Sequence, residues 1–202
     1  MNILTAEQQE GLQEIANIGM GQAGASIATI LDEFVVLSVP NVVVLQPGEI
    51  SRQIVKIVGD EIVSAVRQAF HSTFRGEAIV IYHYHPGENI ADLMGYDPSV
   101  DTIEEYEVIL DITNILVGAC LGGIAAQLGA DIGFSAPSIM AERVPANRLF
   151  SPEEIGTSCA LFIEVNFALE SRNFSCHLLA LLPEQEISIL AQAVDQFIEK
   201  FG

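Results

Sequence analysis

A carboxylate and a carboxamide recur at the same spacing in two parts of the sequence. Glu14 stands three residues before Asn17, and Asp111 stands three residues before Asn114. On an α-helix, positions three apart lie about 60° apart around the axis, so each pair shares one face. A carboxamide carries both a donor and an acceptor, and it can orient a water molecule without becoming charged. Asn is a poor helix former, so its recurrence favours a function over an ordinary solvated face.

The two pairs belong to a longer repeat. Sliding the sequence against itself by 97 residues, without a gap, aligns identical residues from Glu7/Glu104 through Pro40/Pro137 to Pro86/Pro183. Two unrelated segments with similar helix starts are the alternative, but self-similarity at a fixed period is ordinarily architectural. We expect one domain over 1–202, made of two pseudo-symmetric repeats, 1–97 and 98–202. Their joint is expected near the turn formers at 95–99.

Each copy shows the same order of expected elements. Thr5 and Gln8 form a capping box that begins a helix over 5–18. A second helical stretch is predicted over 20–33, with a counterpart over 117–130. Strands are predicted over 35–45, interrupted at Pro40, and over 61–71, 78–85, 160–170 and 175–182. A helix follows Pro86 and Pro183, the last over 186–201. Helix-helix-strand-strand-strand-helix, taken twice, predicts an α+β fold, an α/β sandwich with a largely antiparallel sheet and an exposed pair of motif helices.

The composition excludes several classes of partner. Eight Lys and Arg stand against 27 Asp and Glu, for a net charge of −19. Nucleic acids and anionic membrane surfaces are therefore not expected partners. Half of the 202 residues are hydrophobic and 17% are charged, which predicts a sizeable core rather than disorder.

The sequence also predicts the compartment. No apolar run of about 18 residues is free of polar interruption, so we expect no membrane span. The N-terminus has no basic segment typical of a secretory signal. Cys120, Cys159 and Cys176 lie among apolar neighbours without a CxxC spacing, which favours buried reduced thiols over a disulfide or a redox pair. These features predict a cytoplasmic protein.

Three further patterns are weaker candidates for chemistry. Gly19, Gly21 and Gly24 satisfy GxGxxG, but a dinucleotide site needs a preceding strand. A helix is expected there, so close packing is the preferred interpretation. His83 and His85 alternate on one predicted strand, with a third histidine at 71 on its neighbour. A structural zinc site usually needs four ligands, so surface or half-buried histidines are favoured over a metal site. The serines at 26, 38 and 64 lack a GxSxG setting, and a serine hydrolase is not supported.

At the paired residues the sequence resembles the CheC/CheX/FliY phosphatases of bacterial chemotaxis. The family motif is Asp or Ser, three residues, Glu, two residues, Asn, 22 residues and Pro. Glu14, Asn17 and Pro40 match it. The second copy matches at Asn114 and the proline at 137, with Asp111 in place of Glu. The run NIGMGQA over 17–23 is similar to the NIGxGxA run of the family, and two motifs in one chain resemble its tandem members.

The resemblance implies hydrolysis of the aspartyl phosphate on a phosphorylated CheY-like receiver domain. It implies that Asn17 and Asn114 orient the attacking water, and that Glu14 and Asp111 dock the lysine of the receiver. The receiver carries Mg²⁺ and the phosphoryl group, so no cofactor or metal site is expected in this chain. Positioning suits this reaction, because a loose transition state depends mainly on orientation and charge.

The sequence departs from the motif at two places. The leading position is Glu10 or Glu107 rather than Asp or Ser, and Asp111 is one methylene shorter than Glu. We therefore rank the first site above the second and predict that Asn17→Ala removes more activity than Asn114→Ala. The alternative function is a non-catalytic adaptor that binds a receiver, a CheD-like protein or the flagellar switch. Two sites in one chain make a dimer unnecessary, so a monomer is expected.

Overall fold

The computed structural model describes residues 4–46, 48–83, 105–150, 160–169 and 174–201. Its helices are α1 (Ala6–Leu31), α2 (Ile50–Val58), α3 (Glu105–Gln127) and α4 (Glu184–Phe201), with a short 3₁₀ helix at Ala146–Arg148. Its strands are β1 (Val36–Leu37), β2 (Asn41–Leu45), β3 (Ile62–His71), β4 (Arg75–His83), β5 (Gly133–Phe134), β6 (Ser138–Pro145), β7 (Ala160–Leu169) and β8 (Phe174–Pro183).

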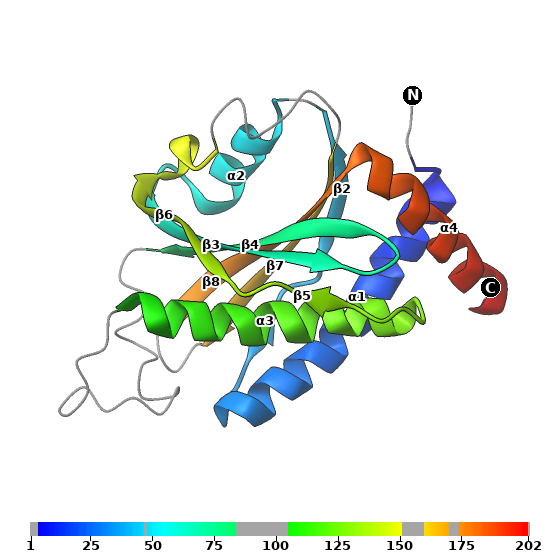
Figure 1. The fold of residues 1–202 in the computed structure, drawn as a ribbon, viewed down its shortest axis with the longest axis horizontal. Helices are drawn as coiled ribbons and strands as arrows, with labels where there is room; N and C mark the ends of the chain where they lie inside the picture. The colour runs from blue at the N-terminus through cyan, green and yellow to red at the C-terminus, as the bar shows by residue number, and fades with distance from the viewer. Residues whose placement is uncertain (1–3, 47, 84–104, 151–159, 170–173, 202) are drawn as a thin grey trace.

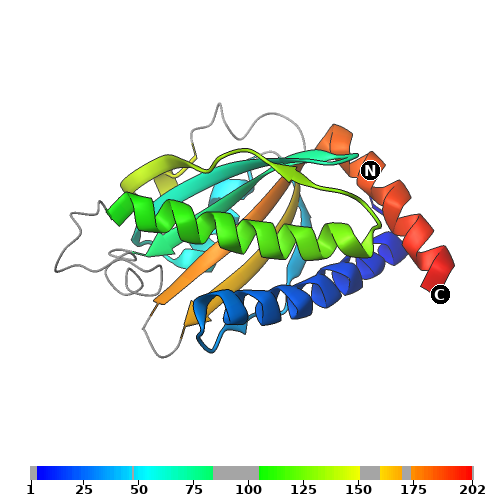
Figure 2. The same ribbon diagram turned by 60° about the horizontal axis from the view of Figure 1, so that its bottom comes forward.

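The eight strands form one sheet between layers of helices. The strand order is β1-β7-β8-β4-β3-β5, with β2 also paired to β7 and β6 to β3, and every described pairing is antiparallel. Helices α1 and α3 lie side by side against one face and run in opposite directions, while α2 covers the other face (Figures 1 and 2). The predicted α+β fold with a largely antiparallel sheet is confirmed.

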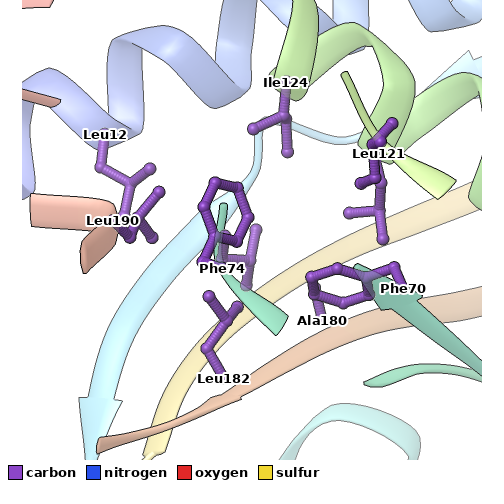
Figure 3. A pocket seen from close by; sticks show the side chains of 10 residues that line it. Leu12, Phe70, Phe74, Leu121, Ile124, Ala180, Leu182 and Leu190 are labelled. Carbon is purple, nitrogen blue, oxygen red and sulfur yellow. The ribbon is translucent and has the colours of Figure 1, made fainter. Parts of the chain in front are cut away.

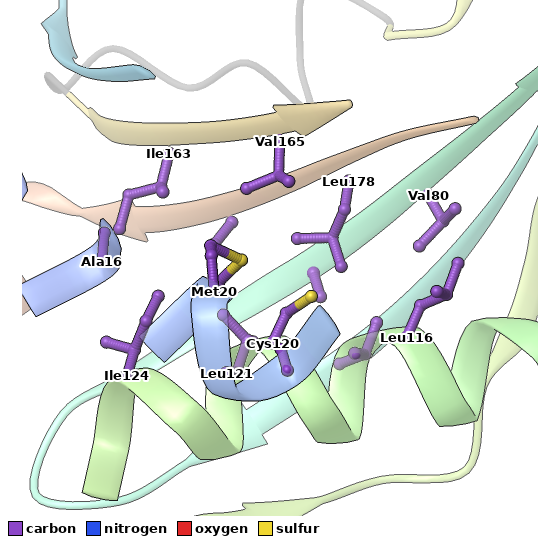
Figure 4. Close-up of a cluster of buried hydrophobic side chains, with 14 of the residues drawn as sticks. Ala16, Met20, Val80, Leu116, Cys120, Leu121, Ile124, Ile163, Val165 and Leu178 are labelled. Carbon is purple, nitrogen blue, oxygen red and sulfur yellow. The ribbon is translucent and has the colours of Figure 1, made fainter. Parts of the chain in front are cut away.

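The central strands are buried on both faces. In β4, Val80 and Tyr82 join the core beneath α1 and α3, whereas Ile79 and Ile81 join the core beneath α2. A strand buried on both faces reads as an unbroken hydrophobic run, which explains the sequence AIVIY at 78–82. Figure 4 shows the first of these cores, where Val80 and the side chains of α1 and α3 meet.

Two segments that stand 97 residues apart make matching hydrogen bonds. The Ser38 N–H donates to the Asn166 carbonyl and its hydroxyl accepts from the Asn166 N–H, both at 2.9 Å. Ser135, 97 positions on, makes the same two bonds with Ala69 at 2.9 and 3.0 Å. Both serines stand two residues before the motif proline, a Ser-x-Pro signal that the sequence reading did not use. The bounds 1–97 and 98–202 stay a prediction, because the joint lies outside the described residues.

The gapless register holds only as far as β3 and β7. Val80 faces α1 and α3, but His177, 97 positions on, pairs with Ile81 and so shares the opposite face. His83 and Pro183 occupy corresponding ends of the two hairpins and differ by 100 positions. The predicted alignment beyond this point is therefore wrong, because the β7–β8 hairpin is longer than the β3–β4 hairpin.

The predicted pair of helices in each copy is also wrong. Residues 6–31 form one continuous helix, and so do residues 105–127. The glycines at 19 and 21 favour a break locally, but the helix continues through both of them, and Gly19 packs against the backbone of α3. Helix α2 was not predicted, and the helix expected after Pro86 lies outside the described residues. The remaining predicted strands and the last helix are confirmed within a few residues.

Helix α3 is apolar enough to deserve comparison with a membrane span. Among the described residues it is the one helix that is long and apolar enough, over Tyr106–Gln127, with a mean hydropathy of 1.9. Of that segment, 56% is buried inside the fold, and core helices of soluble proteins meet the same criteria. No span was predicted from the sequence, because Asp111 and Asn114 interrupt the apolar run.

Candidate functional site

Helix α1 presents its apolar side to the core and its motif to solvent. The predicted capping box is confirmed: the Gln8 N–H donates to Thr5 Oγ1 at 3.1 Å, and the Thr5 N–H donates to Gln8 Oε1 at 3.0 Å. From there, residues at helical spacing are buried: Leu12, Ile15, Ala16, Gly19, Met20, Ala23, Ile27 and Leu31. Glu14 and Asn17 lie on the other side and are exposed.

In the described part of the first site, a neighbouring residue makes the hydrogen bond and the two motif residues do not. Among the described residues, none forms a hydrogen bond with the side chain of Glu14 or Asn17. Beside them, Gln13 Nε2 donates to the carbonyl of Pro40, which is buried. This bond ties the segment carrying the motif proline to α1. The acid and the amide are therefore both accessible to a docking protein.

The second site has an additional partner in the sheet. Asp111 and Asn114 are exposed on α3. Asn114 Oδ1 accepts a hydrogen bond of 2.9 Å from Nε2 of Gln68 on β3. The same nitrogen donates to the Ser135 carbonyl at 2.8 Å, and Gln68 is only 1% exposed. The sequence reading missed Gln68. A glutamine between Val66 and Phe70, at the inward positions of the strand, is the signal that identifies it.

A buried polar contact anchors α3 one residue earlier. The hydroxyls of Thr113 and Tyr82 lie 2.6 Å apart, and the Thr113 hydroxyl donates to the Ile109 carbonyl at 2.6 Å. Burial raises the pKa of Tyr82 well above its ordinary value; nearby Cys176 adds to the rise and the Thr113 hydrogen bond opposes it. The Tyr82 hydroxyl therefore stays protonated and acts as a structural hydrogen-bonding group.

The GxGxxG glycines lie within α1, as the packing interpretation predicts. A Cβ on Gly19 would lie 2.7 Å from the backbone nitrogen of Ile124, and one on Gly123 would lie 2.5 Å from the Gly19 carbonyl oxygen. Gly24 is in ordinary contact distance of Leu37, whereas Gly21 faces open space. A dinucleotide site needs a strand before these glycines, so nucleotide binding is not supported.

Two histidines, at positions 83 and 177, lie close to carboxylates on the α2 side of the sheet. His83 Nδ1 lies 2.9 Å from Glu61 Oε2, and the rings of His83 and His177 are 5.7 Å apart. His177 Nδ1 lies 3.5 Å from Glu164 Oε1. Within the described part of the chain, no group of three or more His, Cys, Asp or Glu is placed to hold a metal ion. His85 lies outside the described residues.

The thiols that the structure describes are buried. Cys120 and Cys176 are free and buried. Burial raises the pKa of Cys120 to about 12, and burial followed by the proximity of Cys120 raises that of Cys176. Protonated, inaccessible thiols are poor nucleophiles. Cys159 lies outside the described residues.

An internal pocket beneath α1 offers no polar group. Its volume is about 20 Å³ and its lining is entirely apolar, including Leu12, Phe70, Phe74 and Leu190 (Figure 3). Ligand sites are usually about 300–1,000 Å³ and carry a few convergent polar groups. The candidate site is therefore the exposed surface of α1 and α3, which suits a macromolecular partner.

Comparison with known proteins identifies the fold. No family model matches the sequence. The structure is similar to that of FliY from Thermotoga maritima, with a TM-score of 0.70 and 18% identity over 96% of this chain and 98% of that one. It is also similar to the FliM middle domain from H. pylori, with a TM-score of 0.62 and 10% identity over 94% of this chain and 99% of that one. The chemotaxis protein CheX from Desulfovibrio desulfuricans matches with a TM-score of 0.54 and 15% identity over 84% of this chain and 99% of that one. The chain therefore has the fold of the CheC/CheX/FliY group, as its paired motifs predict.

Proposed function

We propose that this chain is a phosphatase that hydrolyses the aspartyl phosphate of a CheY-like receiver domain. The observation that carries the proposal is the exposure of both acid–amide pairs. Glu14 and Asn17 on α1, and Asp111 and Asn114 on α3, are all exposed within a fold shared with CheX and FliY. Buried side chains at these positions would have excluded contact with a protein substrate.

The roles follow from the chemistry of each side chain. The Asn17 or Asn114 carboxamide hydrogen-bonds a water molecule and holds it in line with phosphorus. The water oxygen forms a bond to phosphorus while the bond from phosphorus to the aspartyl oxygen breaks, which yields phosphate and a free carboxylate. The receiver supplies the Mg²⁺ that neutralises charge on the phosphoryl oxygens. This chain supplies orientation of the water, and orientation accounts for a large part of the lowering of the barrier in such a transfer.

The acids serve docking. Glu14 and Asp111 lie one turn before the asparagines on the same faces, where each presents a carboxylate to a lysine of the receiver. Exposed ion pairs are weak individually and are screened by salt. The net charge of −19 adds long-range attraction for a basic surface. We therefore expect the acids to influence KM more than kcat, and the influence to decrease as salt is raised.

The test is the loss of phosphate from a receiver. A CheY-like receiver domain is labelled with radioactive acetyl phosphate in Mg²⁺, and its decay is followed with and without catalytic amounts of the protein. We expect acceleration that is lost when both asparagines become alanine. Ser26→Ala, an exposed change on the same helix as Asn17, is the matched control and should leave the rate unchanged. An unaltered decay rate with the native protein would contradict the proposal.

A non-catalytic adaptor is the second candidate. One observation favours it: the same fold occurs in the FliG–FliM complex from H. pylori, which matches with a TM-score of 0.61 and 12% identity over 94% of this chain and all of that one. An adaptor would bind a receiver, or a CheD-like protein, without accelerating loss of phosphate. Binding measured by isothermal titration alongside the decay assay separates the two functions.

A further inference from the structure

The orientation of the Gln68 side chain is determined by a backbone carbonyl. Its amide nitrogen lies 2.8 Å from the Ser135 carbonyl oxygen, which can only accept. The group facing Ser135 must therefore be the NH₂ end of the side chain. The second N–H of this nitrogen is directed to Asn114 at 2.9 Å. The atom it meets must be an acceptor, so it is the Oδ1 of Asn114.

This chain of bonds determines which end of Asn114 is available to a partner. Its oxygen is engaged below by Gln68, and its NH₂ group keeps two donors for solvent or for a docked protein. A side chain held at one end loses less rotational freedom when it binds. The second site thus has a carboxamide already oriented before a receiver arrives.

As far as the structure describes it, the first site has no corresponding hydrogen bond that orients its carboxamide. The position 97 residues after Gln68 is Val165, which is buried and points toward α1 and α3 (Figure 4). Valine has no polar group, and within the described chain no residue hydrogen-bonds the Asn17 side chain. The two asparagines therefore occupy the same motif position, but the strand beneath them carries glutamine in one case and valine in the other.

Gln68 contributes little net stability, because its two donated hydrogen bonds are offset by a side-chain oxygen that is unpaired in the described part of the fold. Its Oε1 is buried and has no partner among the described residues. A buried, unpaired polar atom costs about 1–3 kcal/mol. An apolar residue, such as the valine of the other copy, would avoid that cost at this place in the sheet. A glutamine at this position is better explained by what its NH₂ group holds.

We propose that Gln68 is a positioning residue for the second site, which orients Asn114 so that its NH₂ end faces the docked receiver. The inference rests on the proposed phosphatase function. It assigns to a buried strand residue a role in a reaction that takes place on the helix above it. Gln68 touches neither substrate nor water in this role and acts through Asn114.

The test isolates each site in turn. In an Asn17→Ala background, only the second site is active, and we expect Gln68→Met to lower kcat about tenfold with KM unchanged. In an Asn114→Ala background, the same change should leave the remaining activity of the first site unaltered. Gln9→Met is the matched control, because the amide of this exposed glutamine also donates to a backbone carbonyl, that of Val42, at 3.1 Å.

A measurement on the unmutated protein covers the case in which Gln68→Met does not fold. The Gln68 side-chain NH₂ protons should exchange slowly with water in NMR spectra, and Asn114→Ala should speed this exchange. Rapid exchange in the native protein would overturn the inference.

The activity outcomes are distinct. No phosphatase activity in the native chain overturns the proposed function and this inference together. Activity with an unchanged kcat for Gln68→Met in the Asn17→Ala background overturns the inference alone. An equal loss in the Asn114→Ala background also overturns it, because that result identifies Gln68 as a general structural residue.

Discussion

Helices α1 and α3 occupy equivalent places in the two copies but are held to the sheet in different ways. The α3 helix has two polar anchors, Thr113 to Tyr82 and Asn114 to Gln68. The corresponding α1 positions are Ala16, which is fully buried, and Asn17, which is exposed. Apolar packing therefore accounts for the inward face of α1, as Figure 4 shows around Ala16 and Met20.

Under the proposed function, the difference means that the two sites divide the requirements of one reaction. The first site has the longer acid, Glu14, above an unsupported amide. The second has the shorter acid, Asp111, beside an amide that Gln68 orients. In the proposed mechanism, docking depends on the acid and orientation of the water depends on the amide. We therefore expect the first site to have the lower KM and the second to have the more favourable geometry for water.

Removing both amides tests whether the sites are independent. Asn17→Ala with Asn114→Ala should lower the catalysed rate about 100-fold or more, because orientation of the water is lost at both sites. Each single variant should keep the activity of the other site. Asn17→Ala should remove a larger share of the activity at receiver concentrations below KM than at saturation, because the first site is expected to have the lower KM. Decay assays at several receiver concentrations check this, and a full loss from either single change would show that the sites are coupled.

The close contact between α1 and α3 can be tested independently of the polar anchors that hold α3 to the sheet. Gly19→Ala should destabilise the fold by about 1–3 kcal/mol, because the added Cβ would lie 2.7 Å from the backbone nitrogen of Ile124. Gly21→Ala is the control, since nothing lies within 4 Å of its Cβ position. It should stabilise α1 by about 0.5–1 kcal/mol. Urea unfolding measures both, and equal effects would contradict the close crossing.

The anchor on α3 can be compared with an exposed threonine on α1. Thr113→Val should lower the free energy of unfolding by about 1–2 kcal/mol, because the buried Tyr82 hydroxyl loses a partner. Thr29→Val is the matched change, since the Thr29 hydroxyl donates to the carbonyl four residues earlier, at 2.9 Å, in an exposed setting. It should alter stability by less than about 0.5 kcal/mol. Equal losses in denaturant unfolding would indicate that the Tyr82 contact contributes nothing.

Exchanging the acids gives the smallest expected effect. Glu14→Asp should raise KM of the first site about threefold, and Asp111→Glu should lower KM of the second by a similar factor, as expected for one exposed ion pair. Each is measured in a background where the other asparagine is alanine. Changes in kcat without changes in KM would show that the acids act in the chemical step rather than in docking.

Local signals in the sequence were sufficient for the elements that depend on local interactions. The capping box at Thr5 and Gln8, the interruption at Pro40 and the strand over 62–71 are all present. The exposure of Glu14 and Asn17 also follows from helical spacing beside buried isoleucines and alanines. These features require only hydrogen bonds and side-chain periodicity within a few residues.

Features that depend on distant contacts were missed. The glycine at 19 favours a helix break until the backbone of Gly123 packs against it. The change of register in β8 depends on hairpin length, and a repeat alignment without gaps cannot include it. Gln68 and Asn114 are 46 residues apart in the sequence. They meet only because β3 passes beneath α3 in the fold.

The Ser-x-Pro segments connect the copies crosswise. Ser38 bonds to β7, and Ser135 bonds to β3, just as β2 joins β7 and β6 joins β3 along the sheet. Each copy therefore completes the other's sheet rather than its own. A chain divided between β4 and α3 would leave both fragments with open strand edges whose natural complements lie in the opposite fragment, so neither half can close the sheet without the other.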